Sequence, residues 1–367
     1  MDLIHPHTKA DVVEALRRAD AERTRLLVVG GRRHIDKGNP AEIDAELWTT
    51  QLDRVVAYEP AEMIAVVEAG MRVGELARIL REGNQEWPVD GPPDATVGGV
   101  IAAGASSARR LRVGAIRDTV IEAEVVTGDA RMVRSGARTV KNVTGYDLHK
   151  LIVGSLGTLA VIVQVALKLR PLPEAAATAS FPTDGDGLVL GAALLRAVPN
   201  AAGVIASLDR VEIRYEGWAD EVRDMVDAGA AIAGTEVAPQ PSGEGLAFST
   251  APPWGGDQGI VVEASVPPSH MTELVDGLDH WQALIGVGIV WFHLGAENEG
   301  TVDERTVAGH LAEIRERAKR LGGIAPVIRG PGGLGDDAVP ALEVHRRLKA
   351  SFDPNGVLAP GRFWGGI

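Results

Sequence analysis

The sequence predicts a protein of the α+β class with about two domains. Its 367 residues exceed the usual size of one domain, and 45% of them are apolar, which is enough for a large buried core. The first third alternates helix and strand signals, and residues 190–325 mix both kinds of element. Between these regions, residues 171–190 combine prolines and alanines with a Thr-Asp-Gly-Asp-Gly run, which is typical of a domain boundary.

The elements of the first third follow from local patterns. Thr8 with Asp11 three residues later resembles a capping box, which predicts a helix that continues through Ala19. A short apolar strand, Leu26–Val29, ends in two glycines. Further expected elements are the strands Val55–Tyr58, Met63–Glu68, Val120–Thr127 and Arg131–Arg134, and the helix Val73–Arg81.

One uncharged run, Leu151–Leu167, could be mistaken for a membrane span. Its glycines, and the β-branched residues of its second half, favour a buried strand that follows a turn. Beyond the boundary we expect strands at Val204–Leu208, Val211–Tyr215, Ile260–Val266 and Gly288–His293, a loop at Pro239–Pro253 and a final helix at Ala338–Lys349.

Charge and cysteine content exclude several classes of function. A net charge of −13 argues against nucleic acid as a main partner, because phosphates would be repelled. The chain has no cysteine, which excludes disulfides, Fe–S clusters, Cys-ligated zinc and a flavin tethered through cysteine. The first residues lack the pattern of a secretion signal. We therefore expect a cytoplasmic protein that is not integral to a membrane, and no metal site.

Four glycine-rich segments share one kind of chemistry. They occupy residues 29–34, 91–104, 112–118 and 141–158, and strands are expected between them. A pyrophosphate needs several converging backbone N–H groups, and glycines allow the backbone to approach it closely. Each segment alone is explained by an ordinary turn, but the four together favour a nucleotide site. Valine at Gly98 or Gly99 is then expected to abolish nucleotide binding and to leave the protein folded.

The order of these motifs resembles the PCMH-type FAD domain of the vanillyl-alcohol-oxidase family. The resemblance rests on the Gly-Gly loop, Pro-x-x-x-Thr-Val-Gly-Gly, Gly-x-x-x-Asp, Asn-Val-x-Gly-Tyr-Asp and Gly-x-x-Gly-x-Leu. Within this family the chain is most similar to FAD-binding subunits of glycolate oxidase, and residues 348–362 match the family's ending. The likeness is good over residues 1–173 and 340–367 and poor between them.

This resemblance implies an FAD site. Residues 30–34 and 96–99 would wrap the pyrophosphate, while Gly104 and Gly114 would lie along the path of the flavin. The implied FAD residues are Gly30, Gly31, Arg32, Arg33, His34, Pro93, Thr96, Val97, Gly98, Gly99, Gly104, Gly114, Asp118, Asn142, Gly145, Tyr146, Gly157 and Ile162. FAD is expected to be bound without a covalent link.

Two positions depart from the family's pattern. Arg33 stands where the family usually has a small hydroxyl residue, so Arg32 and Arg33 either add charge to the phosphates or crowd them. Ala359 replaces the asparagine often found before Pro-Gly-Arg.

Catalytic candidates are fewer. The segment from His293 to Asn298 faintly resembles the His-x-Gly-Asp-Gly-Asn strand of flavin-dependent 2-hydroxy-acid dehydrogenases, but it lacks the Asp-Gly pair. Oxidation of a hydroxy acid needs a base near the hydroxyl and an arginine on the carboxylate. His293 with Arg329 or Arg362 could supply these groups, although a structural histidine at a strand end explains His293 better.

Two other signals have competing explanations. Residues 330–335 formally fit G-x-G-x-x-G after a possible strand, which would indicate NAD binding, but a solvent loop explains them better. Arg109, Arg110, Arg112 and Arg117 form a basic cluster, which is either a solvated loop or a contact for a phosphate, an anionic substrate or an acidic partner.

The resemblance implies a fold, an activity and partners. We expect a PCMH-type FAD domain of two α/β subdomains (1–173), a mixed α/β cap domain (174–337) and a C-terminal helix and tail that return to the FAD domain (338–367). The expected function is that of an FAD-binding subunit in a glycolate-oxidase-like complex acting on a small 2-hydroxy acid. A catalytic flavin subunit and an Fe–S subunit would be separate chains, which could hold this one at the inner membrane. A self-sufficient dehydrogenase and a scaffold with a degenerate FAD site remain alternatives.

Overall fold

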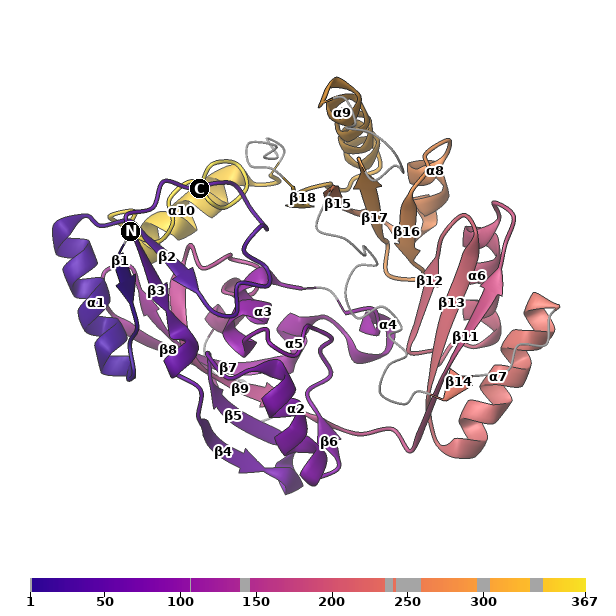
Figure 1. Cartoon of the computed structure of the whole chain (residues 1–367), viewed down its shortest axis with the longest axis horizontal. Coiled ribbons are helices and arrows are strands. Elements are labelled where there is room, and N and C mark those ends of the chain that lie inside the picture. The colour runs from indigo at the N-terminus through magenta and orange to yellow at the C-terminus, as the bar shows by residue number, and fades with distance from the viewer. Residues whose placement is uncertain are drawn as a thin grey trace. The chain divides into compact units, whose positions relative to one another are not determined.

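The computed structural model describes residues 2–105, 107–138, 146–234, 240–241, 259–295, 304–330 and 339–367. Its contacts form two units: Met1–Ser106 with Ala115–Leu172 and Gly332–Ile367, and Ser107–Gly114 with Pro173–Pro331. Both units combine helices with sheets (Figure 1), which confirms the α+β class. The predicted division into an FAD domain, a cap domain and a returning C-terminal segment stays a prediction.

The first unit begins with a small parallel sheet. Its strands are β1 (Asp2–Ile4), β3 (Ala45–Trp48) and β2 (Leu26–Val29), in that order. The predicted capping box opens α1 (Lys9–Glu22), because Thr8 Oγ1 accepts from Asp11 N at 3.2 Å and Asp11 Oδ2 accepts from Thr8 N at 2.8 Å. Val12 and Leu16 of this helix pack with Leu26 and Leu47 of the sheet.

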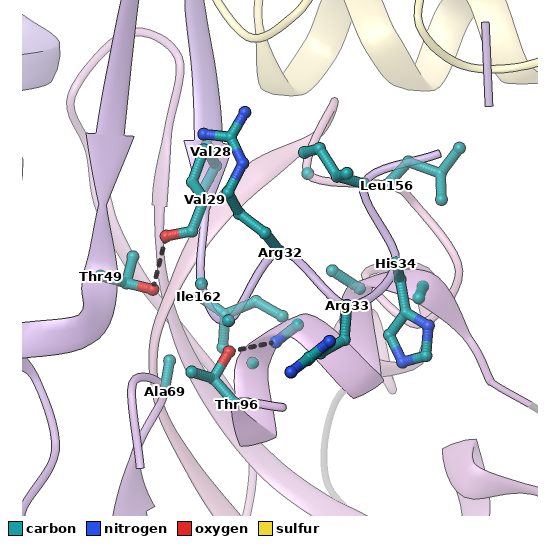
Figure 2. Close-up of a pocket in the computed structure, with 18 of the residues that line it drawn as sticks. Val28, Val29, Arg32, Arg33, His34, Thr49, Ala69, Thr96, Leu156 and Ile162 are labelled. Carbon is teal, nitrogen blue, oxygen red and sulfur yellow. Dashed lines mark hydrogen bonds between the residues drawn. The ribbon is translucent and has the colours of Figure 1, made fainter. Parts of the chain in front are cut away.

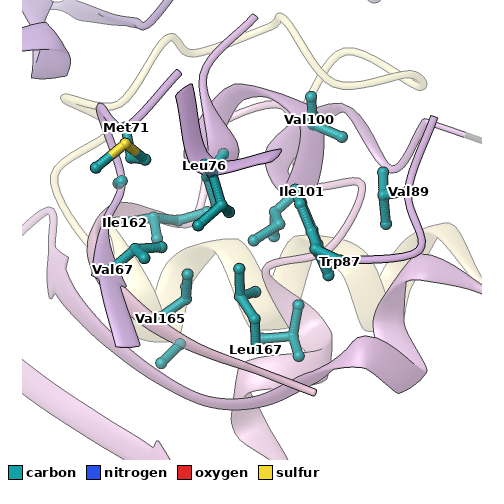
Figure 3. Close-up of a cluster of buried hydrophobic side chains, with 14 of the residues drawn as sticks. Val67, Met71, Leu76, Trp87, Val89, Val100, Ile101, Ile162, Val165 and Leu167 are labelled. Carbon is teal, nitrogen blue, oxygen red and sulfur yellow. The ribbon is translucent and has the colours of Figure 1, made fainter. Parts of the chain in front are cut away.

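A five-stranded antiparallel sheet forms the second half of this unit. Its order is β4 (Val55–Glu59), β5 (Ile64–Glu68), β9 (Ala160–Lys168), β7 (Val120–Thr127) and β8 (Met132–Gly136). The uncharged run thus ends in the central strand β9, as predicted. Figure 3 shows the core on one face, where Val67, Val165 and Leu167 meet Leu76 and Ile101. The helices are α2 (Val73–Glu82), α3 (Val97–Ala103) and α5 (Ile116–Thr119), and a separate pair joins β6 (Gln85–Glu86) to β10 (Arg170–Pro171).

Among the described residues, no helix has the length and apolar character needed to cross a membrane. Short 3-10 helices occur at Thr49–Gln51, Pro60–Glu62, Leu148–Leu151 and Pro268–His270.

The C-terminal segment belongs to the first unit. In α10 (Leu342–Phe352), Lys349 Nζ donates to Asp353 Oδ2 at 2.5 Å and to the carbonyls of Thr158 and Leu358 at 2.8 and 2.7 Å. The carboxylate of Asp353 in turn accepts from two backbone amides of the following turn. The tail then lies along the edge of β2, because Leu26 N donates to Val357 O and Ala359 N donates to Leu26 O. The C-terminal motif therefore fixes the tail beside the strand that leads into the first glycine loop.

The second unit is built on one eight-stranded sheet. The strand order is β14 (Gln240–Pro241), β11 (Ala175–Pro182), β13 (Arg210–Gly217), β12 (Gly203–Ala206), β16 (Trp281–Leu284), β17 (Ile289–Leu294), β15 (Ile260–Ser265) and β18 (Val327–Arg329). Its helices are α4 (Arg110–Val113), α6 (Gly187–Ala197), α7 (Ala219–Ala233), α8 (Met271–Val275) and α9 (Glu304–Arg320).

The expected boundary at 171–190 is more ordered than its composition indicates. It contains the whole of β11, whose residues Ala177, Ala179 and Phe181 alternate toward the interior. Alanine has a low strand propensity, but burial of every second residue against the helices outweighs that preference.

Candidate functional site

A pocket in the first unit gathers most of the predicted nucleotide residues (Figure 2). Four segments supply most of its lining: the end of β2 with the loop after it, the start of α3, the start of β9 with the turn before it, and the C-terminal tail. The predicted site residues among the lining are Gly30, Gly31, Arg32, Arg33, His34, Thr96, Gly98, Gly99, Gly157, Ile162 and Arg362.

The loop after β2 leaves its backbone donors open. In the described part of the chain, the amides of Gly31, Arg32, Arg33 and His34 have no hydrogen-bond acceptor. Arg32 has a φ of +58°, and a left-handed residue within such a loop turns successive N–H groups toward one point, as in anion-binding nests. The glycines before it allow close packing, since a Cβ on Gly31 would lie 2.5 Å from Asp94 O. This loop can therefore hold an anion through its main chain.

The two arginines of this loop are held by carboxylates. Arg32 Nη1 donates to Glu46 at 2.9 and 3.0 Å, and its guanidinium lies 5.3 Å from the centre of the Trp48 ring. Glu46 is buried and also accepts from Trp48 Nε1 at 2.9 Å. In Figure 2 the Arg32 side chain is directed away from Thr96. Arg33 Nε donates to Asp94 Oδ2 at 2.7 Å. Both side chains thus have carboxylate partners, although both also line the pocket.

His34 ends the line of free amides. Burial, with a smaller contribution from Lys37, lowers the pKa of His34 to about 4. Its Nε2 is buried and has no hydrogen-bond partner among the described residues. Since a buried polar atom without a partner is costly, this nitrogen is suited to a ligand that enters the pocket.

The start of α3 behaves differently from the expectation. Val97 N donates to Met71 O at 2.9 Å, Gly98 N donates to Ala69 O at 2.7 Å, and Gly99 N donates to Thr96 Oγ1 at 3.2 Å. Neither glycine has a positive φ. Neighbouring protein groups therefore satisfy these three amides, whereas the Thr96 hydroxyl only accepts a bond here and keeps its proton to donate. The inference that this segment serves a pyrophosphate stays a prediction, which the three amides do not support. The glycines are needed for packing: a Cβ on Gly98 would lie 2.8 Å from Ala69 Cβ.

None of the other predicted residues that the structure describes lines this pocket. Pro93 packs against Gly74, and Gly104 packs against Gly154 at the end of α3. Gly114 belongs to the second unit, and Asp118 and Tyr146 are exposed. Asn142 and Gly145 lie outside the described residues.

The basic cluster is largely engaged within the protein. Arg109 is buried and pairs with Glu216 at 3.2 Å, and Arg112 donates to Asn200 O at 3.0 Å. Arg117 lies 3.9 Å from the carboxylate of Asp118.

The NAD interpretation of residues 330–335 also lacks support, because β18 before them is antiparallel to β15, whereas the dinucleotide motif follows a strand of a parallel sheet. Residues 331–335 themselves lie outside the described residues.

Two catalytic candidates share one sheet of the second unit. His293 in β17 and Arg329 in β18 are both backbone partners of Val261 in β15, on opposite sides of it. Cross-strand partners present their side chains on the same face, so His293 and Arg329 are on one face, about 10 Å apart at the backbone. Nε and Nη2 of Arg329 are buried and have no partner within the described residues. Ala296, Glu297 and Asn298 lie outside those residues.

Arg362, the third catalytic candidate, lies in the first unit. It is 8% exposed and lines the same pocket as the first glycine loop. The structure thus assigns it to the nucleotide pocket rather than to the sheet of His293 and Arg329.

Comparison with known proteins identifies the pocket-bearing region. Residues 3–136 match the family described as FAD binding domain. These residues form an FAD-binding domain. The resemblance to PCMH-type FAD-binding oxidoreductases is therefore confirmed, and the cofactor of the chain is FAD.

Similarity also extends over the whole chain. The glycolate oxidase subunit GlcE of Escherichia coli is 27% identical over 96% of this chain and 96% of its own. The mitochondrial D-lactate dehydrogenase [cytochrome] of Arabidopsis thaliana is 26% identical over 98% of this chain and 72% of its own. A solved alkyldihydroxyacetonephosphate synthase shares the fold, with a TM-score of 0.69 at 15% identity, covering 98% of this chain and 75% of that protein. The chain is an FAD-dependent oxidoreductase.

Sequence reasoning missed part of the pocket. Thr49, Ala69, Ala102 and Ala160 line it as small residues, and Glu46 fixes the position of Arg32. The proximity of Ala69 to Gly98 depends on how β5 and α3 pack, which no local pattern carries. Ala102 follows Gly98-Gly99 by one helical turn, so its place on the same face could have been predicted.

Proposed function

We propose that this chain is the FAD-binding subunit of a glycolate-oxidase-like complex that oxidises a small 2-hydroxy acid. The observation that carries the proposal is the similarity to a glycolate oxidase subunit over 96% of both chains. Its partners would be a catalytic flavin subunit and an Fe–S subunit, since a chain without cysteine has no thiolates for a cluster. Through them the complex would be cytoplasmic and attached to the inner membrane.

The FAD would be held in the pocket of the first unit. The free amides of residues 31–34 would bind the diphosphate, Gly30 would allow the close approach, and Gly157 and Ile162 would contact the cofactor beside them. The open donors and the unpartnered His34 Nε2 support this fit. When bound, FAD supplies an acceptor for the two electrons and the hydrogen that leave the hydroxyl-bearing carbon.

Any substrate roles that this chain itself contributes, beside those of a catalytic partner, would fall to the second unit. The Arg329 guanidinium would bind the carboxylate of the 2-hydroxy acid, and His293 would accept the proton of the hydroxyl. Their common face, and the unpartnered nitrogens of Arg329, support these roles. The side chain of His293 lies close to Gly259, since a Cβ there would be 2.5 Å from His293 Nε2, so the imidazole is held by the sheet.

A self-sufficient dehydrogenase is the second candidate. The similarity to a D-lactate dehydrogenase over 98% of this chain favours it. The two candidates differ in whether the purified chain turns over substrate by itself.

The experiment compares the chain alone with the chain co-expressed with its genomic neighbours, using glycolate or D-lactate and an artificial dye acceptor. We expect turnover only with the partners, because the segment from His293 to Asn298 lacks the Asp-Gly pair of the catalytic strand that it resembles. Rapid turnover by the single chain that is lost in His293→Ala would instead establish the self-sufficient dehydrogenase.

Acid precipitation of the same samples should release all flavin to the supernatant, and flavin in the pellet would contradict non-covalent binding.

A further inference from the structure

Arg362 is held firmly against the first glycine loop. Its Nη2 donates to Ile35 O at 2.7 Å, which is the carbonyl directly after the line of free amides. Its own backbone is fixed as well, because Asn39 N donates to Arg362 O at 2.7 Å. The Asn39 side chain donates to Gly361 O and Phe363 O, both at 3.3 Å. The guanidinium therefore has a defined position at the pocket.

The charge of Arg362 has no counter-ion in contact. Among the described residues, no carboxylate lies within 4.0 Å of it, and only Ile35 O accepts from its guanidinium. The buried Arg109 differs, since Glu216 lies 3.2 Å away. Burial lowers the pKa of Arg362 and the charge of Asp36, which is not in contact, opposes this effect, although an arginine stays charged at every working pH. A cation that is 8% exposed and has no carboxylate in contact is costly, so a bound anion would compensate it.

The surroundings of the guanidinium specify where this anion lies. Arg362 shares the pocket with the four free amides of Gly31 to His34 and with the unpartnered Nε2 of His34. Two kinds of donor, main-chain amides and a guanidinium, thus line one space together with a histidine nitrogen that donates when it carries the ring proton. Backbone amides beside a forked guanidinium are the donors that phosphate groups prefer.

We propose that Arg362 binds the diphosphate of FAD, so that the C-terminal tail supplies the cation of the cofactor site. The proposal rests on FAD occupying this pocket, and it replaces the role of Arg362 as a clamp on the substrate carboxylate. It also gives the tail a function: the hydrogen bonds between β2 and residues 357–359 place Arg362 beside the loop that follows β2.

The test measures ligand affinity of flavin-free protein by calorimetry, with FAD, ADP and riboflavin as probes. In Arg362→Ala we expect FAD and ADP to bind about ten- to hundredfold more weakly, because a charged hydrogen-bond pair is lost. Riboflavin has no phosphate, and its affinity should change less than threefold. Arg362→Lys keeps the charge but not the fork, and should recover part of the affinity. Arg347→Ala, at an exposed arginine of α10, is the matched control and should bind all three probes normally.

Each other outcome overturns the proposal. Unchanged FAD and ADP affinity in Arg362→Ala, with a higher KM for the 2-hydroxy acid, would return Arg362 to the substrate. An equal loss for riboflavin and ADP, with a lower melting temperature, would show a structural role for the Ile35 contact. If the unaltered protein does not bind FAD, the proposed function itself fails, which is a separate result.

Discussion

Two glycine pairs lie at the FAD pocket, and they are there for different reasons. Gly30-Gly31 lead into a loop in which the backbone amides of residues 31–34 are free and the backbone of Arg32 has a left-handed conformation. Gly98-Gly99 begin a helix with ordinary φ angles, and both of their amides are taken by Ala69 and Thr96. The first pair opens the main chain to an anion, whereas the second lets α3 pack closely on its neighbours. Consecutive glycines therefore indicate a close approach, but not what approaches.

The largest expected effect is a lower free energy of unfolding when a residue of the second glycine pair, Gly98-Gly99, is replaced. In Gly98→Val the new side chain would collide with Ala69, whose Cβ and carbonyl lie 2.8 and 3.0 Å from the position of a Cβ. We expect a loss of about 3 kcal/mol of unfolding free energy in the flavin-free protein. This differs from the simple loss of FAD binding expected from the sequence.

Denaturant unfolding of the flavin-free protein measures this loss, and Gly91→Val is its control. A Cβ on Gly91 would meet only Val100 Cγ2 at 3.6 Å, which is an ordinary contact. If Gly98→Val keeps its stability and loses only FAD, the second pair contacts the phosphates after all.

An intermediate effect concerns His34, at the end of the first loop. Its folded-state pKa of about 4 lies below the ordinary 6.5, so the unfolded chain binds the proton more tightly. Above pH 6.5 His34 is neutral in both the folded and the unfolded chain. As the pH falls toward 4 the unfolded chain takes up the proton first, which lowers the free energy of unfolding by about 3 kcal/mol at most. His34→Gln should therefore show a flatter fall of melting temperature between pH 7 and pH 4.5.

His7→Gln, at an exposed histidine, should follow the unaltered protein through the same pH range. A bound diphosphate would raise the pKa of His34, so FAD binding near pH 5 should take up protons in the unaltered protein and fewer in His34→Gln. Equal proton uptake in both would show that the phosphates are distant from this loop.

The smallest expected effect concerns a position where the backbone has a left-handed conformation although the residue is not glycine. Ala359 has a φ of +40°, a conformation that asparagine, the residue expected here from the family resemblance, adopts more readily than alanine. Ala359→Gly should raise the unfolding free energy by about 0.5–1 kcal/mol, because glycine adopts this conformation without strain. Ala102→Gly, within α3, should lower it by a similar amount. Thermal melts of both variants measure the contrast, and a loss in both would mean that the turn at Ala359 is unstrained.

Sequence reasoning correctly predicted those elements whose signal lies in neighbouring residues. The Thr8 capping box, the strand Leu26–Val29 and the strand Val120–Thr127 depend on neighbouring residues, and all three were predicted closely. The free amides beside Arg32 were also within reach, since a glycine pair after a strand predicts an open loop.

What sequence reasoning could not supply depends on distant partners. The acceptor for Gly98 N is in the residue after β5, and the place of Arg362 depends on pairing between the tail and β2. The roles of His293 and Arg329 depend on strand order in the eight-stranded sheet, which brings both to Val261 although 36 residues separate them in the chain. These facts arise from sheet pairing, and no spacing rule in the sequence expresses them.

The position of the tail beside β2 also determines the order in which the parts of the cofactor pocket come together during synthesis. The ribosome makes the first glycine loop and α3 early, then all of residues 173–331, and only afterwards Val357 to Arg362. Until these residues emerge, β2 keeps an open edge and the loop lacks its guanidinium. A nascent chain thus carries most of the residues that line its cofactor pocket long before the ribosome adds the segment that covers the edge of β2 and supplies Arg362.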